Sequence, residues 1–189
     1  AVLGAARAAK RQGMHLITSV IEHPSVADSF HRLEEEGYEV TYLPVDENGY
    51  VSIECLKAAM REDTTLVSIM YVNNEVGAVQ DIAALSAAVK TVNPKCVFHT
   101  DCVQAFGKHI IPSACVDMVS VSGHKIHAPK GVGALYVKKG IRLKNLHFGG
   151  GQEKGVRPGT ENTASIISFG LAAEIADKAI NESFYRVLE

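Results

Sequence analysis

The chain of 189 residues has 19 Lys and Arg against 21 Asp and Glu, and 47% of its residues are hydrophobic. This composition predicts one domain, residues 1–189, with a substantial core, while the formal net charge of −2 argues against nucleic-acid binding, which needs a basic surplus. No apolar run approaches the roughly 18 residues of a membrane span and no secretory signal opens the chain, so we expect a cytoplasmic protein without membrane contact.

Hydrophobic periodicity and turn residues divide the chain into alternating helices and strands. In chain order, we predict a helix at residues 1–10, a strand at 15–19, a helix at 26–36, a strand at 38–43, a helix at 52–60, a strand at 65–71, a helix at 81–92, strands at 96–99, 116–121 and 132–137, and a helix at 165–180. Gly37 is placed to end one of these helices, and Ser52 is placed to cap another.

Strands that alternate with helices imply right-handed crossovers and a mainly parallel sheet flanked by helices, which is an α/β fold. The first and last residues continue helical patterns without start or stop signals, so we expect the chain to be part of a longer polypeptide.

Polar clusters follow three of the predicted strands, at residues 71–75 (YVNNE), 99–104 (HTDCVQ) and 122–125 (SGHK). In an open parallel sheet, ligands bind beyond the carboxyl ends of the strands. We therefore expect a functional site at this edge of the sheet.

Lys125 directly follows a predicted apolar strand, where a lysine is poorly placed for a solvated surface. Among apolar walls its amine is available to form a Schiff base with a carbonyl group. Gly123 permits a tight turn before it, and the hydroxyl of Ser122 can bind an anion. Taken alone, the short motif fits a structural lysine at the end of a strand equally well.

Asp101 lies just beyond the end of another predicted strand, among small and apolar residues, and a buried carboxylate needs a cationic partner. The protonated pyridine nitrogen of pyridoxal phosphate (PLP) is such a partner, and Gln104 could reach the phenolic oxygen of the same ring. The alternatives are that Asp101 caps a following helix and that Gln104 is a surface amide.

Three more polar residues have a functional and a structural interpretation. His23 could stack on a cofactor ring, or it could simply begin a helix. Asn74 could bond a ring substituent or substrate, or it could form an Asx turn that closes a strand. Thr160 lies where a helix start would suit a phosphate or carboxylate, or it could only cap that helix.

Five segments, taken in order, resemble the cysteine desulfurases of iron–sulfur cluster assembly and nitrogen fixation. They are EHPSV (22–26), NNEVGAVQDI (73–82), HTDCVQAFGK (99–108), SGHKIHAPKGVGALYV (122–137) and FGGGQEKGVRPGTENT (148–163). The resemblance runs over nearly the whole chain, and related selenocysteine lyases share the pattern. It implies the large, PLP-binding domain of a fold-type I PLP enzyme.

The resemblance also implies roles for single residues. Lys125 would hold PLP covalently and then move the α-proton of the substrate, while Asp101 would pair with the pyridine nitrogen. Gln104 would donate to the phenolic oxygen, and His23 would stack on the ring and relay protons. Further cofactor contacts are implied for Asn74, Ser122, His124 and Thr160, the last of which would reach the phosphate held by the neighbouring subunit of a homodimer.

The reaction that the resemblance implies takes sulfur from L-cysteine, leaving alanine and an enzyme persulfide that passes to a scaffold or sulfur-acceptor protein. The family's nucleophilic cysteine and its N-terminal phosphate-binding segment match no part of this sequence, so we expect the chain alone to be inactive. The sequence contains Cys55, Cys96, Cys102 and Cys115. Their spacing predicts free thiols without a disulfide framework or metal site, and Cys102 is expected to be a packing thiol.

Two other functions fit the same pattern. One is a selenocysteine lyase or another PLP-dependent lyase of this fold. The other is a non-catalytic interaction domain, against which the joint presence of Lys125, Asp101, Gln104 and His23 argues.

Overall fold

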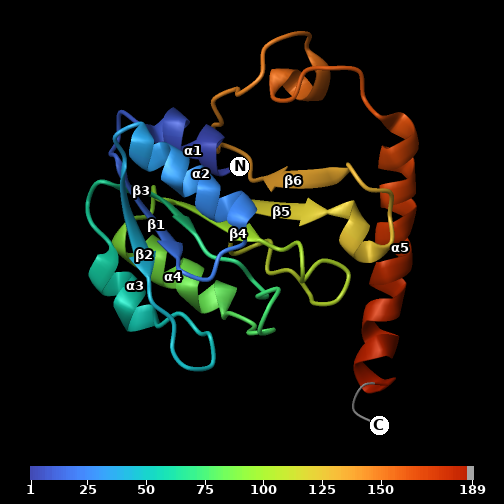
Figure 1. The fold of residues 1–189 in the computed structure, drawn as a ribbon, viewed down its shortest axis with the longest axis horizontal. Helices are drawn as coiled ribbons and strands as arrows, with labels where there is room; N and C mark the ends of the chain where they lie inside the picture. The colour runs from blue at the N-terminus through green and yellow to red at the C-terminus, as the bar shows by residue number, and fades with distance from the viewer. Residues whose placement is uncertain (187–189) are drawn as a thin grey trace.

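Figure 1 shows the computed structural model, which describes residues 1–186 and their side chains as far as residue 180. One sheet has the strand order β2-β1-β3-β4-β5-β6, in which the first five strands pair in parallel and β6 runs antiparallel to β5. The strands are β1 (His15–Ser19), β2 (Glu39–Leu43), β3 (Thr64–Ser68), β4 (Val97–Asp101), β5 (Met118–Ser122) and β6 (Gly133–Val137). The predicted α/β class with a mainly parallel sheet is confirmed.

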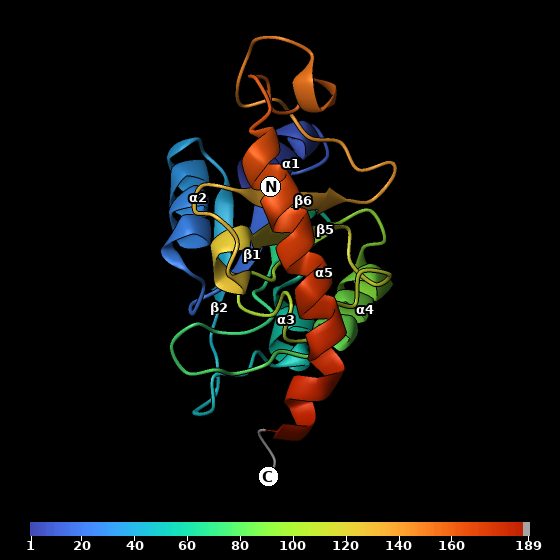
Figure 2. The ribbon, with the colours of Figure 1, turned by 90° about the vertical axis from the view of Figure 1, so that its right-hand side faces the viewer.

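Helices cover both faces of the sheet (Figures 1 and 2). They are α1 (Val2–Ala9), α2 (Pro24–Glu35), α3 (Ile53–Ala59), α4 (Ile82–Val92) and α5 (Thr163–Arg186), with 3₁₀ turns η1 (Gly123–Ile126) and η2 (Gln152–Gly155). The helices α1 and α2 pack together on one face, α3 and α4 pack together on the other, and α5 contacts η1. None of the described helices is both long enough and apolar enough to span a lipid bilayer.

The core has two parts because successive residues of a strand point to opposite faces of the sheet. Leu16 belongs to the cluster beneath α1 and α2, whereas its neighbour Ile17 belongs to the cluster beneath α3 and α4. Leu66 and Val67 divide in the same way on β3. Every residue of β1 and of β3 is buried, as expected for parallel strands that helices cover on both faces.

Local sequence signals set most helix boundaries. The side chain of Ser52 accepts a hydrogen bond from Cys55 N at the start of α3, and Asp81 accepts one from Ala84 N at the start of α4. Gly37 has a φ of 89° after the end of α2, a conformation that glycine adopts without strain. The prediction was less accurate for two strand ends: β3 ends at Ser68 instead of residue 71, and β4 continues to Asp101 instead of ending at residue 99.

The strand order places β1 between β2 and β3. The chain therefore builds the sheet outward in one direction from β1 to β2, and then in the other direction from β3 onward. Such a topological switch point opens a crevice at the carboxyl ends of the two central strands. Here the switch point lies between β1 and β3, which end at Ser19 and Ser68.

Candidate active site

The carboxyl ends of the parallel strands bring several predicted site residues to one edge of the sheet. Asp101 is the last residue of β4 and pairs in register with Ser120 of the neighbouring strand β5. The strand β5 ends at Ser122 and leads directly into η1, which carries Lys125. The structure therefore places Asp101 and Lys125 on neighbouring strand ends, as the sequence predicts.

Asp101 is buried, with 7% of its surface exposed. Its Oδ1 accepts a hydrogen bond of 2.8 Å from Val103 N, and no ion pair joins it to a Lys or Arg in the described part of the chain. Burial raises the pKa of this carboxyl, and the nearby His23 lowers it. The alternative that Asp101 caps a helix is wrong, because residues 103–108 form turns. A buried carboxyl without a cation from the protein fits a cationic ligand group.

Lys125 lies on the short turn η1 and is half-buried. No hydrogen bond or ion pair joins its Nζ to any other side chain that the structure describes. The turn itself is held in place: Ile126 is buried, and a Cβ on Gly123 would approach within 3.0 Å of Val132 and 3.2 Å of Phe169. A packed turn thus carries an amine that no other described side chain engages.

Two predicted phosphate-site residues lie beside Lys125 and contact each other. The hydroxyl of Ser122 is 2.7 Å from Nδ1 of His124. Gln104 is half-buried in the turn after Asp101, and its side chain makes no hydrogen bond among the described residues. The amide is therefore available to a ligand at this edge.

His23 caps the N-terminus of α2. Its Nδ1 accepts a hydrogen bond of 3.2 Å from Ser25 N and lies 2.8 Å from Ser25 Oγ. The structural interpretation of His23 as a helix start is confirmed. Because Nδ1 is used as an acceptor, the neutral ring carries its proton on Nε2, and the exposed ring has a fixed orientation near Asp101.

The Asx turn that sequence analysis considered for Asn74 is formed by its neighbour. Oδ1 of Asn73 accepts hydrogen bonds of 2.9 Å from both Glu75 N and Val76 N. Asn74 is exposed and makes no side-chain hydrogen bond within the described residues. The turn interpretation is therefore wrong for Asn74, which leaves its amide free for a ligand.

Thr160 does not cap α5. That helix begins at Thr163, and Oδ1 of Asn162 accepts a hydrogen bond of 3.3 Å from Ser165 N. Thr160 itself is exposed. The segment between β6 and α5 loops outward beyond the start of α5 (Figures 1 and 2), so the structure does not bring it to the strand ends that carry Asp101 and Lys125.

Glu22 is a further residue of this edge that sequence analysis missed. Its Oε1 accepts hydrogen bonds of 2.6 Å from Ser19 Oγ and 2.8 Å from Met70 N, whereas its Oε2 is buried without a partner. Burial raises the pKa of this carboxyl to about 8, and the charge of Asp101 contributes to the rise. The only sequence signal was its place directly before His23, beyond a buried strand.

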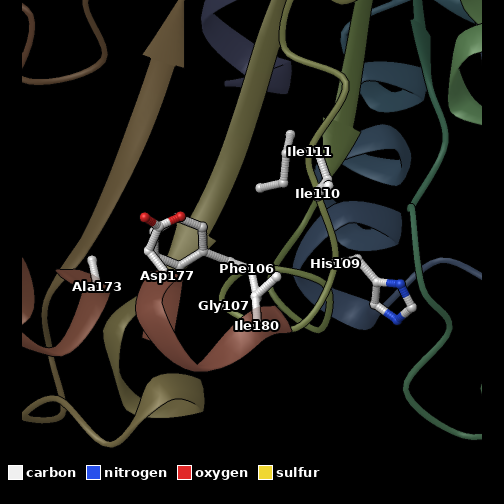
Figure 3. A pocket seen from close by; sticks show the side chains of 8 residues that line it. All are labelled: Phe106, Gly107, His109, Ile110, Ile111, Ala173, Asp177 and Ile180. Atoms are coloured by element: carbon white, nitrogen blue, oxygen red, sulfur yellow. The ribbon is translucent and has the colours of Figure 1, made fainter. Parts of the chain in front are cut away.

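A cavity of about 320 Å³ lies beside this edge, between the segment after β4 and α5. Figure 3 shows its lining: Phe106, Gly107, His109, Ile110, Ile111, Ala173, Asp177 and Ile180. None of these is a predicted site residue, and most of the side chains are apolar. The convergent polar groups lie instead at the strand ends, where we place the candidate active site.

Known proteins share both the sequence and the fold. The model of a family described as Aminotransferase class-V matches residues 1–185. A cysteine desulfurase IscS of Clostridium botulinum is 48% identical over 179 residues, which are 93% of this chain and 44% of that protein. The chain thus spans about half the length of the curated relatives it matches.

Two solved structures superpose closely. A structure described as a NifS-like protein has a TM-score of 0.92 at 39% identity, over 96% of this chain and 51% of that one. A structure described as SspA in complex with cysteine has a TM-score of 0.85 at 41% identity, over 92% of this chain and 50% of the other.

Proposed function

Because the chain belongs to the class-V aminotransferase family, we propose that it is the PLP-binding part of a cysteine desulfurase. Relatives named cysteine desulfurase IscS support this activity. The observation that carries the proposal is that the buried Asp101 carboxyl ends β4, while the turn that follows the neighbouring strand β5 carries the Lys125 amine. In this proposal residues 1–189 form one domain.

The residues at the site fit PLP. Asp101 lacks a cation from the protein, and the protonated pyridine nitrogen of PLP would supply one. The hydroxyl of Ser122 and the imidazole of His124 already contact each other and would bind the phosphate. Gln104 and Asn74 have free amides that would donate to the ring substituents. When bound, PLP withdraws electrons from an amino-acid substrate and weakens the bonds at its Cα and Cβ.

Lys125 has two roles in this proposal. Its amine would hold the cofactor covalently and, once the substrate amine has displaced it, would move the α-proton of the substrate. Both roles need an amine that no carboxylate occupies, which is the state of Lys125 among the described side chains. His23, whose ring is fixed through Ser25, would stack on the cofactor and relay a proton through Nε2.

The proposed reaction converts L-cysteine and an enzyme thiol into alanine and an enzyme persulfide. The carbon–sulfur bond of cysteine breaks, a sulfur–sulfur bond to the enzyme thiol forms, and the carbon that lost sulfur takes up a proton. The exchange balances without an external oxidant. The structure described as SspA in complex with cysteine supports cysteine as the substrate class. The persulfide would then pass to a scaffold or sulfur-acceptor protein.

Two of the four thiols are unsuited to be the nucleophile. Cys96 and Cys102 are buried, and burial raises the pKa of each to about 12, so neither supplies a thiolate at neutral pH. Cys115 is exposed but precedes the amino end of β5, at the edge opposite Lys125. We therefore propose that the attacking thiol comes from outside the strand-end cluster. A separate proposal concerns Thr160, which would contact a second subunit of a homodimer.

The direct test of this function is the formation of alanine from L-cysteine by the full-length gene product supplied with PLP. We expect Lys125→Ala to lower the rate by about a hundredfold or more, because the amine acts in binding and in proton transfer. The exposed Lys139→Ala is the matched control and should keep the wild-type rate. Equal rates for Lys125→Ala and wild type would refute the assignment.

A further inference from the structure

The carboxyl of Glu22 joins the two strands that flank the topological switch point. It accepts one hydrogen bond from Ser19 Oγ at the end of β1 and one from Met70 N just beyond β3. Crevices at such points are where ligands bind in open parallel sheets. Glu22 therefore lies at the strand ends where we place the proposed cofactor.

The stretch after β3 is held from both sides. Met70 N donates to the side chain of Glu22, and the next amide, Tyr71 N, donates 2.9 Å to the backbone carbonyl of Asp101. Glu22 and Asp101 are thus connected through two successive residues of one backbone. Glu22 also directly precedes His23, so its anchoring restrains the position of that ring.

Glu22 is a neutral carboxylic acid in this setting. No Lys or Arg among the described residues compensates a charge on it, and Asp101 is the titratable group that acts on it, itself faced by His23. Since Oε1 accepts two hydrogen bonds, the proton resides on Oε2, which is buried and unpartnered. A buried polar atom without a partner is destabilising, and such an atom in a native structure calls for an explanation.

We propose that Glu22 is a positioning residue for PLP: its neutral carboxyl ties the end of β1 to the chain beyond β3 and so fixes the spacing between His23 and Asp101. This inference rests on the proposed function. Glu22 touches neither substrate nor the reacting atoms. It acts through the two residues that would contact the cofactor ring.

The test measures PLP binding by the full-length gene product, from the visible absorbance and the circular dichroism of the bound cofactor. Glu22→Ala removes both hydrogen bonds and should weaken binding about tenfold or more, with a changed dichroism band. Glu22→Gln keeps a neutral acceptor of the same length and should bind within about threefold of wild type. Ser19→Ala removes one of the two bonds with little structural change and should weaken binding to an intermediate degree.

The exposed Glu47→Gln is the matched control and should bind as wild type. Wild-type affinity in Glu22→Ala, or a loss in Glu22→Gln equal to that in Glu22→Ala, would overturn the inference. If Glu22→Ala does not fold, wild-type affinity and dichroism in Ser19→Ala overturn it. The two proposals fail separately. If the wild-type protein binds no PLP, the proposed function is refuted. If the wild type binds PLP and the Glu22 and Ser19 variants bind it equally well, only the role of Glu22 is refuted.

Discussion

The side chain of Glu22 accepts a hydrogen bond of 2.8 Å from the backbone N–H of Met70, 48 residues further along the chain. This bond crosses from the end of β1 to the chain beyond β3, and a buried carboxyl makes it. A carboxyl in this position is sensitive to pH, because its burial disfavours the ionised form.

We predict that Glu22 lowers stability as the pH rises. Its folded pKa of about 8 lies above its unfolded value of about 4.3, so between these values the folded protein holds a proton that the unfolded chain releases. Stability then falls through this window and levels off above it. In urea unfolding at pH 5, 7 and 8.5, Glu22→Gln should be more stable than wild type at pH 8.5 by about 2–4 kcal/mol, with a smaller difference at pH 5. Parallel pH profiles for the two proteins would contradict this.

We predict that Gly123→Ala displaces the turn that carries Lys125. The added Cβ would lie 3.0 Å from a side-chain atom of Val132 and 3.1 Å from Cβ of Ala128, so these neighbours or η1 must move by a few tenths of an ångström. Overpacking of this kind is destabilising by about 1–3 kcal/mol, and PLP binding should weaken with it. The control is Gly151→Ala, where a Cβ meets nothing within 4 Å. Thermal unfolding and PLP titration check both variants, and equal behaviour of the two would show that the turn has room to adapt.

We predict that the four cysteines fall into two reactivity classes. Cys55 and Cys115 are exposed, whereas Cys96 and Cys102 are buried with a pKa of about 12. Iodoacetamide at pH 7.5 should therefore modify the first pair in the folded protein and all four in urea, as mass spectrometry of the peptides would show. Rapid modification of Cys102 in the folded state would reopen the possibility that it is the attacking thiol.

Most of the fold could be predicted from the sequence because buried parallel strands and capped helices have strong local signals. His15–Ser19 of β1 is continuously buried, and Ser52 and Asp81 cap the helices that follow them. Lys125 and Asp101 were found for a related reason: polar residues directly after apolar strands are conspicuous.

What could not be predicted depends on contacts distant in the chain or on a choice between neighbours. Asn73 and Asn74 are the same residue type, and only the backbone path decides which one makes the turn. Asn162 and Thr160 compete in the same way for the start of α5. Glu22 has the sequence context of a surface residue before a helix, and only the packing of β1 against β3 reveals that it is buried.

The most direct test of the central claim is to locate the covalent attachment of PLP. The full-length gene product is mixed with PLP and reduced with borohydride, and the modified residue is identified by peptide mass spectrometry. We predict that Lys125 carries the cofactor and that Asp101→Asn lowers the fraction of Lys125 that is modified. Exposed lysines such as Lys139 should be modified no more than they are in denatured protein. Cofactor attached to another lysine with Lys125 unmodified would contradict the account.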